Sequence, residues 1–221
     1  MSSELERHTL VWLSPAGWEG AIASAQPAHK AALAEWRQQD WPAVVRRQDA
    51  DVGAGADISV VFLGVPLPPD AAGVKVRIPL RVSSALVARA TPAITLREAL
   101  PASGAWHDDL AALCDAAPTL RVFGSLAMQA LTGQQYVSPT SDVDLLFHPS
   151  SRSQLENVMS LLTTHAEHLP LDGELVFPDG AAVSWKEWRM AITHPAKVMV
   201  KELHTVRLAN TASLLATLEA S

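Results

Sequence analysis

Four consecutive features in the middle of the chain restrict its fold more than any other part of the sequence. Residues 120–123 are typical of a short strand, and Gly124-Ser125 follows directly. Residues 126–132 are expected to form a helix, because the apolar pattern stops at Gly133. A second apolar strand is expected over residues 142–147. A strand, a tight turn, a helix and another strand in this order predict a sheet flanked by helices.

Two aspartates begin the second of these strands. Asp142 and Asp144 are separated by one residue, so strand alternation places both carboxylates on one face, while Val143 and Leu145 point into the core. Two carboxylates on one face can hold Mg²⁺, which prefers a few carboxylate oxygens together with waters and substrate phosphates. An isolated Asp-x-Asp pair is commonly a solvated strand end. Beside a Gly-Ser turn, it predicts a metal-assisted phosphoryl or nucleotidyl transfer site.

The Gly124-Ser125 turn has its own chemistry. A glycine lets a phosphate approach the backbone closely, and the start of a helix supplies N–H donors and the positive end of the helix dipole. Ser125 adds a hydroxyl donor at the same point. The turn therefore predicts a phosphate-binding site next to the aspartates.

The charge balance argues against a nucleic-acid-binding protein. The chain carries 17 basic and 23 acidic residues, a net charge of −6, whereas nucleic-acid binders present a basic stripe to the phosphates. Its 221 residues, 48% of them hydrophobic, can bury a core in one domain or in two small ones.

The cysteine content and the hydropathy of the chain indicate the cellular compartment of the protein. Cys114 is the single cysteine, so no disulfide can form within the chain and a cytoplasmic location is expected. The first residues are acidic where a secretory leader would be basic. No stretch reaches the roughly 18 uninterrupted apolar residues of a membrane span. We expect neither a leader nor a membrane segment.

The periodicity of the rest of the chain predicts an α+β protein with two domains. Residues 84–105 are rich in alanine and interrupted by Pro92 and Pro101, so a boundary is expected there. We predict a smaller N-terminal accessory domain of the α/β type over residues 1–85 and a catalytic domain over residues 86–221. The other expected elements are strands at 8–13, 42–47, 58–65, 75–82, 171–177, 181–185, 197–200 and 204–208, helices at 27–39, 106–116 and 211–219, a helix capped by Ser151 or Ser153, and a turn at 49–57.

Gly-Ser followed by Asp-x-Asp on an apolar strand resembles the DNA polymerase beta-like nucleotidyltransferase superfamily, although the interval from Ser125 to Asp142 is longer than is usual there. The longer string 124–133, with Tyr136 and then residues 141–146, is similar to the malonate decarboxylase holo-acyl-carrier-protein synthases, also called phosphoribosyl-dephospho-CoA transferases. Residues 44–47, 64–68 and 172–188 fit that family as well, so the resemblance covers most of the chain. Met128 departs from it, because Trp is expected more often at that position.

The resemblance implies a polymerase beta-like catalytic domain, with a mixed sheet flanked by helices, and a nucleotidyltransferase of the EC 2.7.7 type. The implied donor is 2'-(5''-triphosphoribosyl)-3'-dephospho-CoA. The implied acceptor is a serine of the acyl-carrier protein subunit of malonate decarboxylase, and pyrophosphate is released. Transfer of AMP from ATP to another acceptor, or an inactive binding module of the same fold, are the alternatives.

The resemblance also implies two Mg²⁺ ions, with Mn²⁺ as an alternative, bound by Asp142, Asp144 and a third carboxylate. Asp172 and Glu174 alternate onto one face of a strand, and Glu174 is preferred because Asp172 precedes Gly173 and can serve the bend instead. A triphosphate needs further cations. The candidates are Arg121, next to the Gly-Ser turn, and Lys201, with Arg77, Arg81, Lys186 and Lys197 as other basic residues on or beside strands.

Recognition of an acidic carrier protein would require a local basic patch, because the chain itself has a net negative charge. The basic residues that cluster best in the N-terminal half are Arg46, Arg47, Arg77 and Arg81. We expect them to contact the carrier. Tyr136 and Trp185 are aromatic residues that could stack on adenine, although such residues more often belong to a core.

Overall fold

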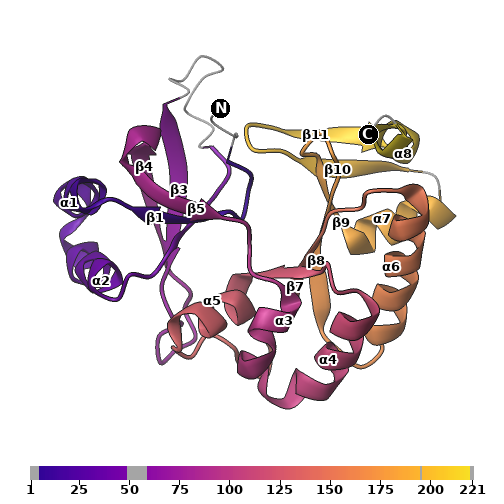
Figure 1. The fold of residues 1–221 in the computed structure, drawn as a ribbon, viewed down its shortest axis with the longest axis horizontal. Helices are drawn as coiled ribbons and strands as arrows, with labels where there is room; N and C mark the ends of the chain where they lie inside the picture. The colour runs from indigo at the N-terminus through magenta and orange to yellow at the C-terminus, as the bar shows by residue number, and fades with distance from the viewer. Residues whose placement is uncertain (1–4, 49–58, 195, 220–221) are drawn as a thin grey trace. The chain divides into compact units, whose positions relative to one another are not determined.

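The computed structural model describes residues 5–48, 59–194 and 196–219, and the chain divides into two compact units, Met1–Ala93 and Ile94–Ser221. Each unit has one sheet with helices, which confirms the α+β class (Figure 1). The division lies after Ala93 rather than after residue 85. The reason is that β5 (Val87–Thr91), which was not expected, pairs with β1 (Leu10–Leu13) in the N-terminal sheet.

The N-terminal unit has a five-stranded sheet in the order β4-β3-β2-β1-β5, and all its pairs are antiparallel. The sequence predicted an α/β arrangement here, but the strands are antiparallel. The reason is that two consecutive helices separate β1 from β2. They return the chain to the end of the sheet where β1 finished, so β2 runs antiparallel to β1. The other elements are α1 (Pro15–Ser24), α2 (Pro27–Gln38), β2 (Ala43–Val45), β3 (Val60–Pro66), β4 (Arg77–Ser83) and a 3₁₀ turn (Ser84–Leu86).

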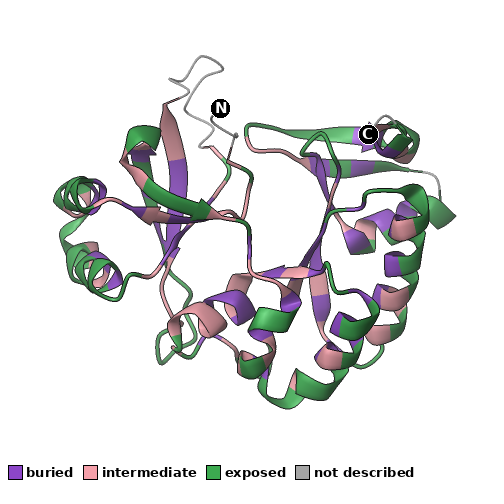
Figure 2. Ribbon diagram, viewed as in Figure 1, coloured by how far each residue is buried: buried purple, intermediate pink, exposed green. Residues whose placement is uncertain are grey.

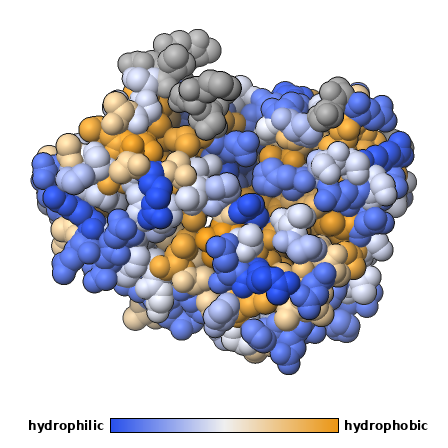
Figure 3. Space-filling model, in the orientation of Figure 1, coloured by the Kyte–Doolittle hydropathy of each residue, from blue (hydrophilic) through white to orange (hydrophobic). Residues whose placement is uncertain are grey.

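One face of the N-terminal sheet forms the core of its unit. Ile78 and Leu80 of β4 are buried and alternate with exposed Pro79 and Arg81. Helices α1 and α2 lie together on one side of the sheet (Figure 1), and α1 packs against β4. The outer surface of α2 is mostly polar in the space-filling view (Figure 3). The sheet therefore presents its other face, with Arg81, away from this core.

The C-terminal unit has a six-stranded mixed sheet in the order β11-β10-β9-β8-β7-β6. Among the strands of the described residues, only β7 and β8 pair in parallel, and α6 (Arg152–His165) connects them. Ser151 caps α6 as expected, because its hydroxyl accepts a hydrogen bond from Gln154 N at 3.2 Å. The strands are β6 (Arg121–Phe123), β7 (Val143–Phe147), β8 (Leu171–Val176), β9 (Ala182–Ser184), β10 (Lys197–Lys201) and β11 (Val206–Asn210).

Helices cover one face of this sheet and build a single hydrophobic core with it. Val143, Leu145 and Phe147 of β7 belong to the core and are at most 2% exposed. Purple, buried segments run along the middle of the sheet and the inner sides of the helices (Figure 2). The remaining helices are α3 (Leu96–Ala99), α4 (His107–Ala116), α5 (Gly124–Thr132), α7 (Trp185–Thr193) and α8 (Thr211–Glu219), with 3₁₀ turns at Leu100–Ala102 and Gly104–Trp106.

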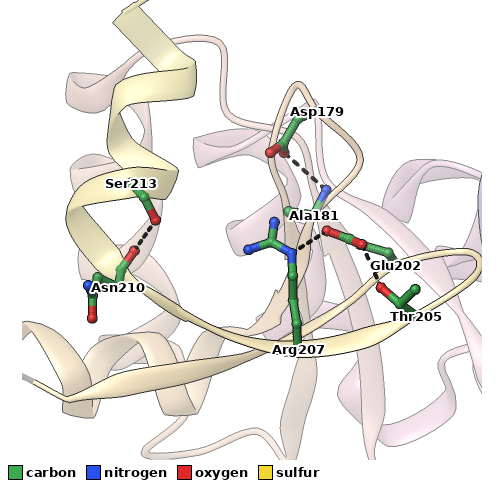
Figure 4. Close-up of polar contacts among 7 residues, drawn as sticks. All are labelled: Asp179, Ala181, Glu202, Thr205, Arg207, Asn210 and Ser213. Carbon is green, nitrogen blue, oxygen red and sulfur yellow. Dashed lines mark hydrogen bonds and ion pairs between the residues drawn. The ribbon is translucent and has the colours of Figure 1, made fainter.

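The β10–β11 connection is held by Glu202 (Figure 4). Its carboxylate accepts hydrogen bonds from Thr205 Oγ1 at 2.8 Å and from Arg207 Nε at 2.7 Å. Burial raises the pKa of Glu202, but these two hydrogen bonds outweigh it and hold the pKa below its ordinary value. The turn before β9 has a similar contact, since Ala181 N donates to Asp179 Oδ1 at 3.1 Å.

Most of the elements expected from the sequence are confirmed, but α1, β5 and α7 were missed. The signal for α1 was present, because Ser14 accepts a hydrogen bond from Gly17 N and Pro15 occupies the first turn. The turn expected over residues 49–57 lies outside the described residues. No helix in the described part of the chain is both long and apolar enough to cross a membrane.

Candidate active site

The turn between β6 and α5 brings the backbone of Gly124 against the carboxylate of Asp144. Gly124 has a φ of 66°, in the left-handed region that side chains disfavour. A Cβ atom built on Gly124 would lie 2.0 Å from Asp144 Oδ2 and 2.9 Å from its Cγ. Only a glycine allows this approach. The structure therefore brings the turn and one of the two aspartates together.

The two aspartates lie at the beginning of β7. Asp144 is within the strand, and Asp142 immediately precedes it. Burial alternates along this segment: Val143 and Leu145 are buried, Asp142 is exposed and Asp144 is half-buried. This is the pattern of a strand with one face in the core and one face of carboxylates.

The strand register extends this polar face across the sheet. Asp144 lies opposite Phe123 of β6 and opposite Asp172 of β8. In the next row, Leu146 lies opposite both Arg121 and Glu174. Neighbouring strands are about 4.8 Å apart, so these side chains are neighbours. We call this side of the sheet the carboxylate face, defined by Arg121, Asp144, Asp172, Glu174 and Lys201.

Asp172 and Glu174 have different surroundings on this face. Asp172 Oδ1 accepts a hydrogen bond from Gly173 N at 2.8 Å, so it supports the bend, and Lys186 Nζ lies 3.8 Å away. Glu174 is only 6% exposed and pairs with Lys201 Nζ at 3.1 Å. The ammonium group compensates the charge of this buried carboxylate. The sequence predicted a role for both Glu174 and Lys201, but not that they form a pair.

Gly173 is a structural requirement that sequence reasoning assigned only to a bend. Its φ is 134°, and a Cβ atom there would lie 1.9 Å from the carbonyl oxygen of Leu145. The backbones of β7 and β8 therefore approach closely between the rows that carry Asp144 and Glu174. A side chain at residue 173 would separate the two carboxylate-bearing strands.

Arg121 and Ser125 flank the turn. Both are half-buried, and Arg121 is close enough to Glu98 to contribute to its titration. The hydroxyl and N–H of Thr95 chiefly hold the pKa of Glu98 below its ordinary value, and the charge of Arg121 adds to this effect. At the N-terminus of α5, the N-cap residue Phe123 makes no side-chain cap hydrogen bond. This helix end suits an anion.

Gln129 orders the segment that connects α5 to β7, and sequence reasoning missed it. Its Oε1 accepts hydrogen bonds from Tyr136 N at 3.0 Å and Val137 N at 2.9 Å, while its Nε2 donates to Ala102 O at 2.8 Å. One amide side chain thus fixes the segment before the aspartates. Tyr136 and Trp185, considered for adenine stacking, are 4% and 1% exposed and belong to the interior.

The described residues contain no group of three or more His, Cys, Asp or Glu side chains that could hold a metal ion by themselves. The chemistry of the donor set still fits Mg²⁺. Asp142 and Asp144 supply carboxylate oxygens, and Mg²⁺ completes its coordination with waters and substrate phosphates rather than with an all-protein cage. Asp142, Asp144 and Glu174 therefore do not form a preassembled triad.

Two family models match the chain. The model of the phosphoribosyl-dephospho-CoA transferase MdcG C-terminal domain matches residues 81–212, and that of the MdcG N-terminal domain matches residues 6–93. The chain belongs to this family. The resemblance inferred from the sequence is confirmed, and it extends over both units.

Curated relatives in the phosphoribosyl-dephospho-CoA transferase family include one from Xanthomonas campestris pv. campestris (strain 8004), which is 41% identical over 82% of this chain and 84% of its own length. Another, from Xanthomonas euvesicatoria pv. vesicatoria (strain 85-10), is 38% identical over 94% of this chain and 95% of its own length. A phosphoribosyl-dephospho-CoA transferase from Bradyrhizobium diazoefficiens is 35% identical over 82% and 80%, respectively. No solved structure matches the chain.

Proposed function

We propose that this protein transfers the 2'-(5''-phosphoribosyl)-3'-dephospho-CoA group from its triphosphate donor to a serine of the acyl-carrier protein subunit of malonate decarboxylase. The proposal makes the protein a nucleotidyltransferase and gives its C-terminal unit a polymerase beta-like fold. We also propose that the reaction takes place in the cytoplasm. The observation that carries the proposed transfer reaction is the contact between Gly124, at a positive φ, and Asp144. This contact puts a phosphate-binding turn directly beside a carboxylate.

The reaction is a displacement at phosphorus. The Oγ atom of the acceptor serine forms a bond to the α-phosphorus of the donor, and the hydroxyl proton is lost. The bond from that phosphorus to the bridging oxygen breaks, and pyrophosphate leaves with the electron pair. Positioning and charge stabilisation account for most of the rate enhancement in reactions of this type.

The residues of the turn bind and orient the donor. Gly124 lets a phosphate reach the backbone, and the N-terminus of α5 presents its positive dipole end. Ser125 and Arg121, on either side of this point, contact phosphate oxygens. Lys201, which is paired with Glu174, lies on the same carboxylate face and is our candidate for a further phosphate contact.

Asp142 and Asp144 would hold Mg²⁺, or Mn²⁺ in its place. Such cations would neutralise phosphate charge and would favour loss of the serine proton. Because Asp142 is exposed and Asp144 is half-buried, one carboxylate is accessible to substrate while the other is held against the turn.

Glu174 is our candidate for the third carboxylate. Asp172 is closer to Asp144 by strand register, but its Oδ1 is engaged by Gly173 N. Glu174→Gln should therefore lower turnover more than Asp172→Asn does. The opposite order in turnover would assign the role to Asp172.

Mass spectrometry of the acceptor tests the proposed function. The protein is incubated with the donor, Mg²⁺ and apo-carrier, and the carrier is then weighed. We expect the carrier serine to gain the mass of the phosphoribosyl-dephospho-CoA group, with one pyrophosphate released for each modified carrier. ATP in place of the donor is the control, and a gain of AMP instead would favour the alternative nucleotidyltransferase.

A further inference from the structure

The strand register gathers basic side chains on one face of the N-terminal sheet. Phe62 lies opposite Arg81 in the β3–β4 pair, and Arg46 N donates to the carbonyl oxygen of Phe62. Arg77 lies four residues before Arg81 on β4, so strand alternation gives both the same face. This is the face opposite the one that β4 buries with Ile78 and Leu80.

The same face continues to the other edge of the sheet. Leu10 of β1 lies opposite Val44, which is two residues before Arg46, so Trp12 shares the face of Arg46. Arg89 of β5 lies opposite Trp12. We call this surface the arginine face. It consists of Trp12, Arg46, Phe62, Arg77, Arg81 and Arg89.

Aromatic rings and backbone hold these arginines in place. The Cζ atoms of Arg46 and Arg81 lie 5.7 and 5.6 Å from the centroid of the Phe62 ring. Arg89 Cζ lies 3.6 Å from the Trp12 ring centroid. The backbone also holds Arg46, because its Nε donates to Leu63 O at 3.1 Å and its Nη1 donates to Arg47 O at 3.2 Å. Arg89 Nη2 lies 3.8 Å from Asp40 Oδ2. These contacts fix where the positive charges of the face lie.

Arg46 and Arg81 line a cleft of about 430 Å³ at the β4 edge of the sheet, together with Ile78 and Leu80 of the opposite face. His29 and Gln26, at the start of α2, form its other wall. Gln26 makes no side-chain cap hydrogen bond, and the first turn of α2 contains no acidic residue. Two guanidinium groups, a histidine and the positive end of a helix dipole thus lie around one cleft, and this arrangement favours a carboxylate there.

The charge of the chain is divided unequally between its two units. Residues 1–93 contain nine Lys and Arg residues and nine Asp and Glu residues, so their net charge is zero. Residues 94–221 contain eight basic and fourteen acidic residues, so they carry the whole charge of −6. An acidic partner is therefore repelled by the catalytic unit and attracted to the arginine face.

We infer that the arginine face is the docking surface for the protein acceptor, and that the cleft between Arg46, Arg81 and the start of α2 receives acidic side chains of that acceptor. This inference rests on the proposed function, because it names where the acceptor of that reaction binds. The face spans five strands, about 19 Å at 4.8 Å per strand, which is a suitable width for a protein–protein contact of standard size.

Direct binding of the apo-carrier to the full chain, without donor, tests the inference independently of the chemistry. Arg46→Gln/Arg81→Gln should weaken binding about tenfold at low salt, and the difference should shrink as salt is added, since exposed charges are screened beyond about 8 Å at physiological ionic strength. The matched control is Arg37→Gln/Arg152→Gln, which removes two exposed arginines paired with Glu19 and Glu156 on helix surfaces. The control should bind like the wild type.

A set of three single variants separates charge from folding. Arg81→Lys keeps the charge and should retain most of the binding, whereas Arg77→Gln and Arg81→Gln, each at an exposed position, should each weaken it. Thermal unfolding checks that all variants remain folded. Wild-type protein that does not bind the apo-carrier, or an arginine-face double variant that binds it unchanged, would overturn the inference.

The affinity for the donor tests whether these arginines bind the donor triphosphate instead of the carrier. We expect calorimetry to give the same donor dissociation constant for the wild type and for Arg46→Gln/Arg81→Gln. Loss of donor binding with unchanged carrier binding would overturn the inference and place these arginines on the triphosphate. Carrier binding without any mass gain would instead contradict the proposed reaction and leave the docking surface supported.

Discussion

The two sheets of this protein carry opposite chemistry on the faces that do not form their cores. The N-terminal sheet presents long arginine side chains over aromatic rings, and Arg77, Arg81 and Arg89 among them are exposed. The C-terminal sheet presents short carboxylates that are half-buried or buried, such as Asp144 and Glu174. Long exposed charges act at a distance and tolerate movement, whereas short buried ones fix atoms. The first arrangement suits recognition and the second suits chemistry.

The backbone supports this difference. On the carboxylate face, Gly124 and Gly173 have positive φ values, and a Cβ atom at either position would overlap its neighbours at about 2 Å. On the arginine face, a Cβ atom at Gly64 would first meet the flexible stem of Arg77, at 2.7 Å. Strained backbone is maintained where geometry matters most. Substitutions should therefore have larger effects on the C-terminal face.

The largest effect is expected from Asp144. Asp144→Asn keeps the size of the side chain and removes the charge that a metal requires, so turnover should fall by about three orders of magnitude, equivalent to about 4 kcal/mol. Asp142→Asn should behave similarly. The measurement is the rate of carrier modification, with exposed Asp108→Asn of α4 as the control. Near-normal turnover in either variant would contradict the proposed metal site.

Gly124→Val should have the next largest effect. Its Cβ would overlap Asp144 Oδ2, so the carboxylate and the turn must separate, and we expect donor affinity and rate together to fall by about two orders of magnitude. Gly133→Ala is the matched control, because its φ is 70° but a Cβ there meets nothing within 4 Å. The control should lower stability by about 1 kcal/mol while leaving the rate unchanged. Equal losses of activity in the two variants would show that the Asp144 contact is unimportant.

Lys201→Met tests the buried pair on the carboxylate face. It leaves Glu174 buried without its ammonium partner, so the free energy of unfolding should fall by about 1–3 kcal/mol. Adding Glu174→Gln should restore part of this loss. Lys186→Met, which affects the exposed 3.8 Å pair with Asp172, should change stability by less than about 1 kcal/mol. Denaturant unfolding of these variants measures the difference.

The smallest effect is expected on the stability of the protein at low pH. Glu98 and Glu202, both in the C-terminal unit, have pKa values below their ordinary value of 4.5. A carboxylate whose pKa is lowered by folding stabilises the folded state above its unfolded pKa, and this contribution is lost as the pH falls through the folded value. Glu202→Gln should therefore reduce the dependence of the melting temperature on pH below about 4.5. An unchanged dependence would assign the acid sensitivity to other groups.

The sequence was sufficient to predict the elements that carry the candidate site where local patterns determine the structure. The Gly-Ser turn and the Asp-x-Asp strand each depend on a few neighbouring residues. The pair between Glu174 and Lys201 joins residues that are distant in the chain, and only the order of the strands brings them together. The same holds for Gln129, whose amide role depends on the path of a loop.

The arginine face shows the same limit of prediction from the sequence. Sequence proximity suggested Arg46 and Arg47 as neighbours in one patch, but Arg46 is half-buried against Phe62, while adjacent residues on an extended backbone point in opposite directions. Arg89 joins the face through the pairing of β5 with β1, and β5 was not expected at all. Membership of a surface is decided by strand register rather than by position along the chain.

Steady-state kinetics of two variants, measured side by side with the carrier as the varied substrate, tests most directly whether the two faces divide recognition from chemistry. We expect Asp144→Asn to lower kcat by about three orders of magnitude with an unchanged KM for the carrier. We expect Arg46→Gln/Arg81→Gln to raise that KM about tenfold at low salt with an unchanged kcat. An arginine-face variant that lowers kcat as far as Asp144→Asn does, or an Asp144→Asn protein that keeps its kcat, would contradict this division.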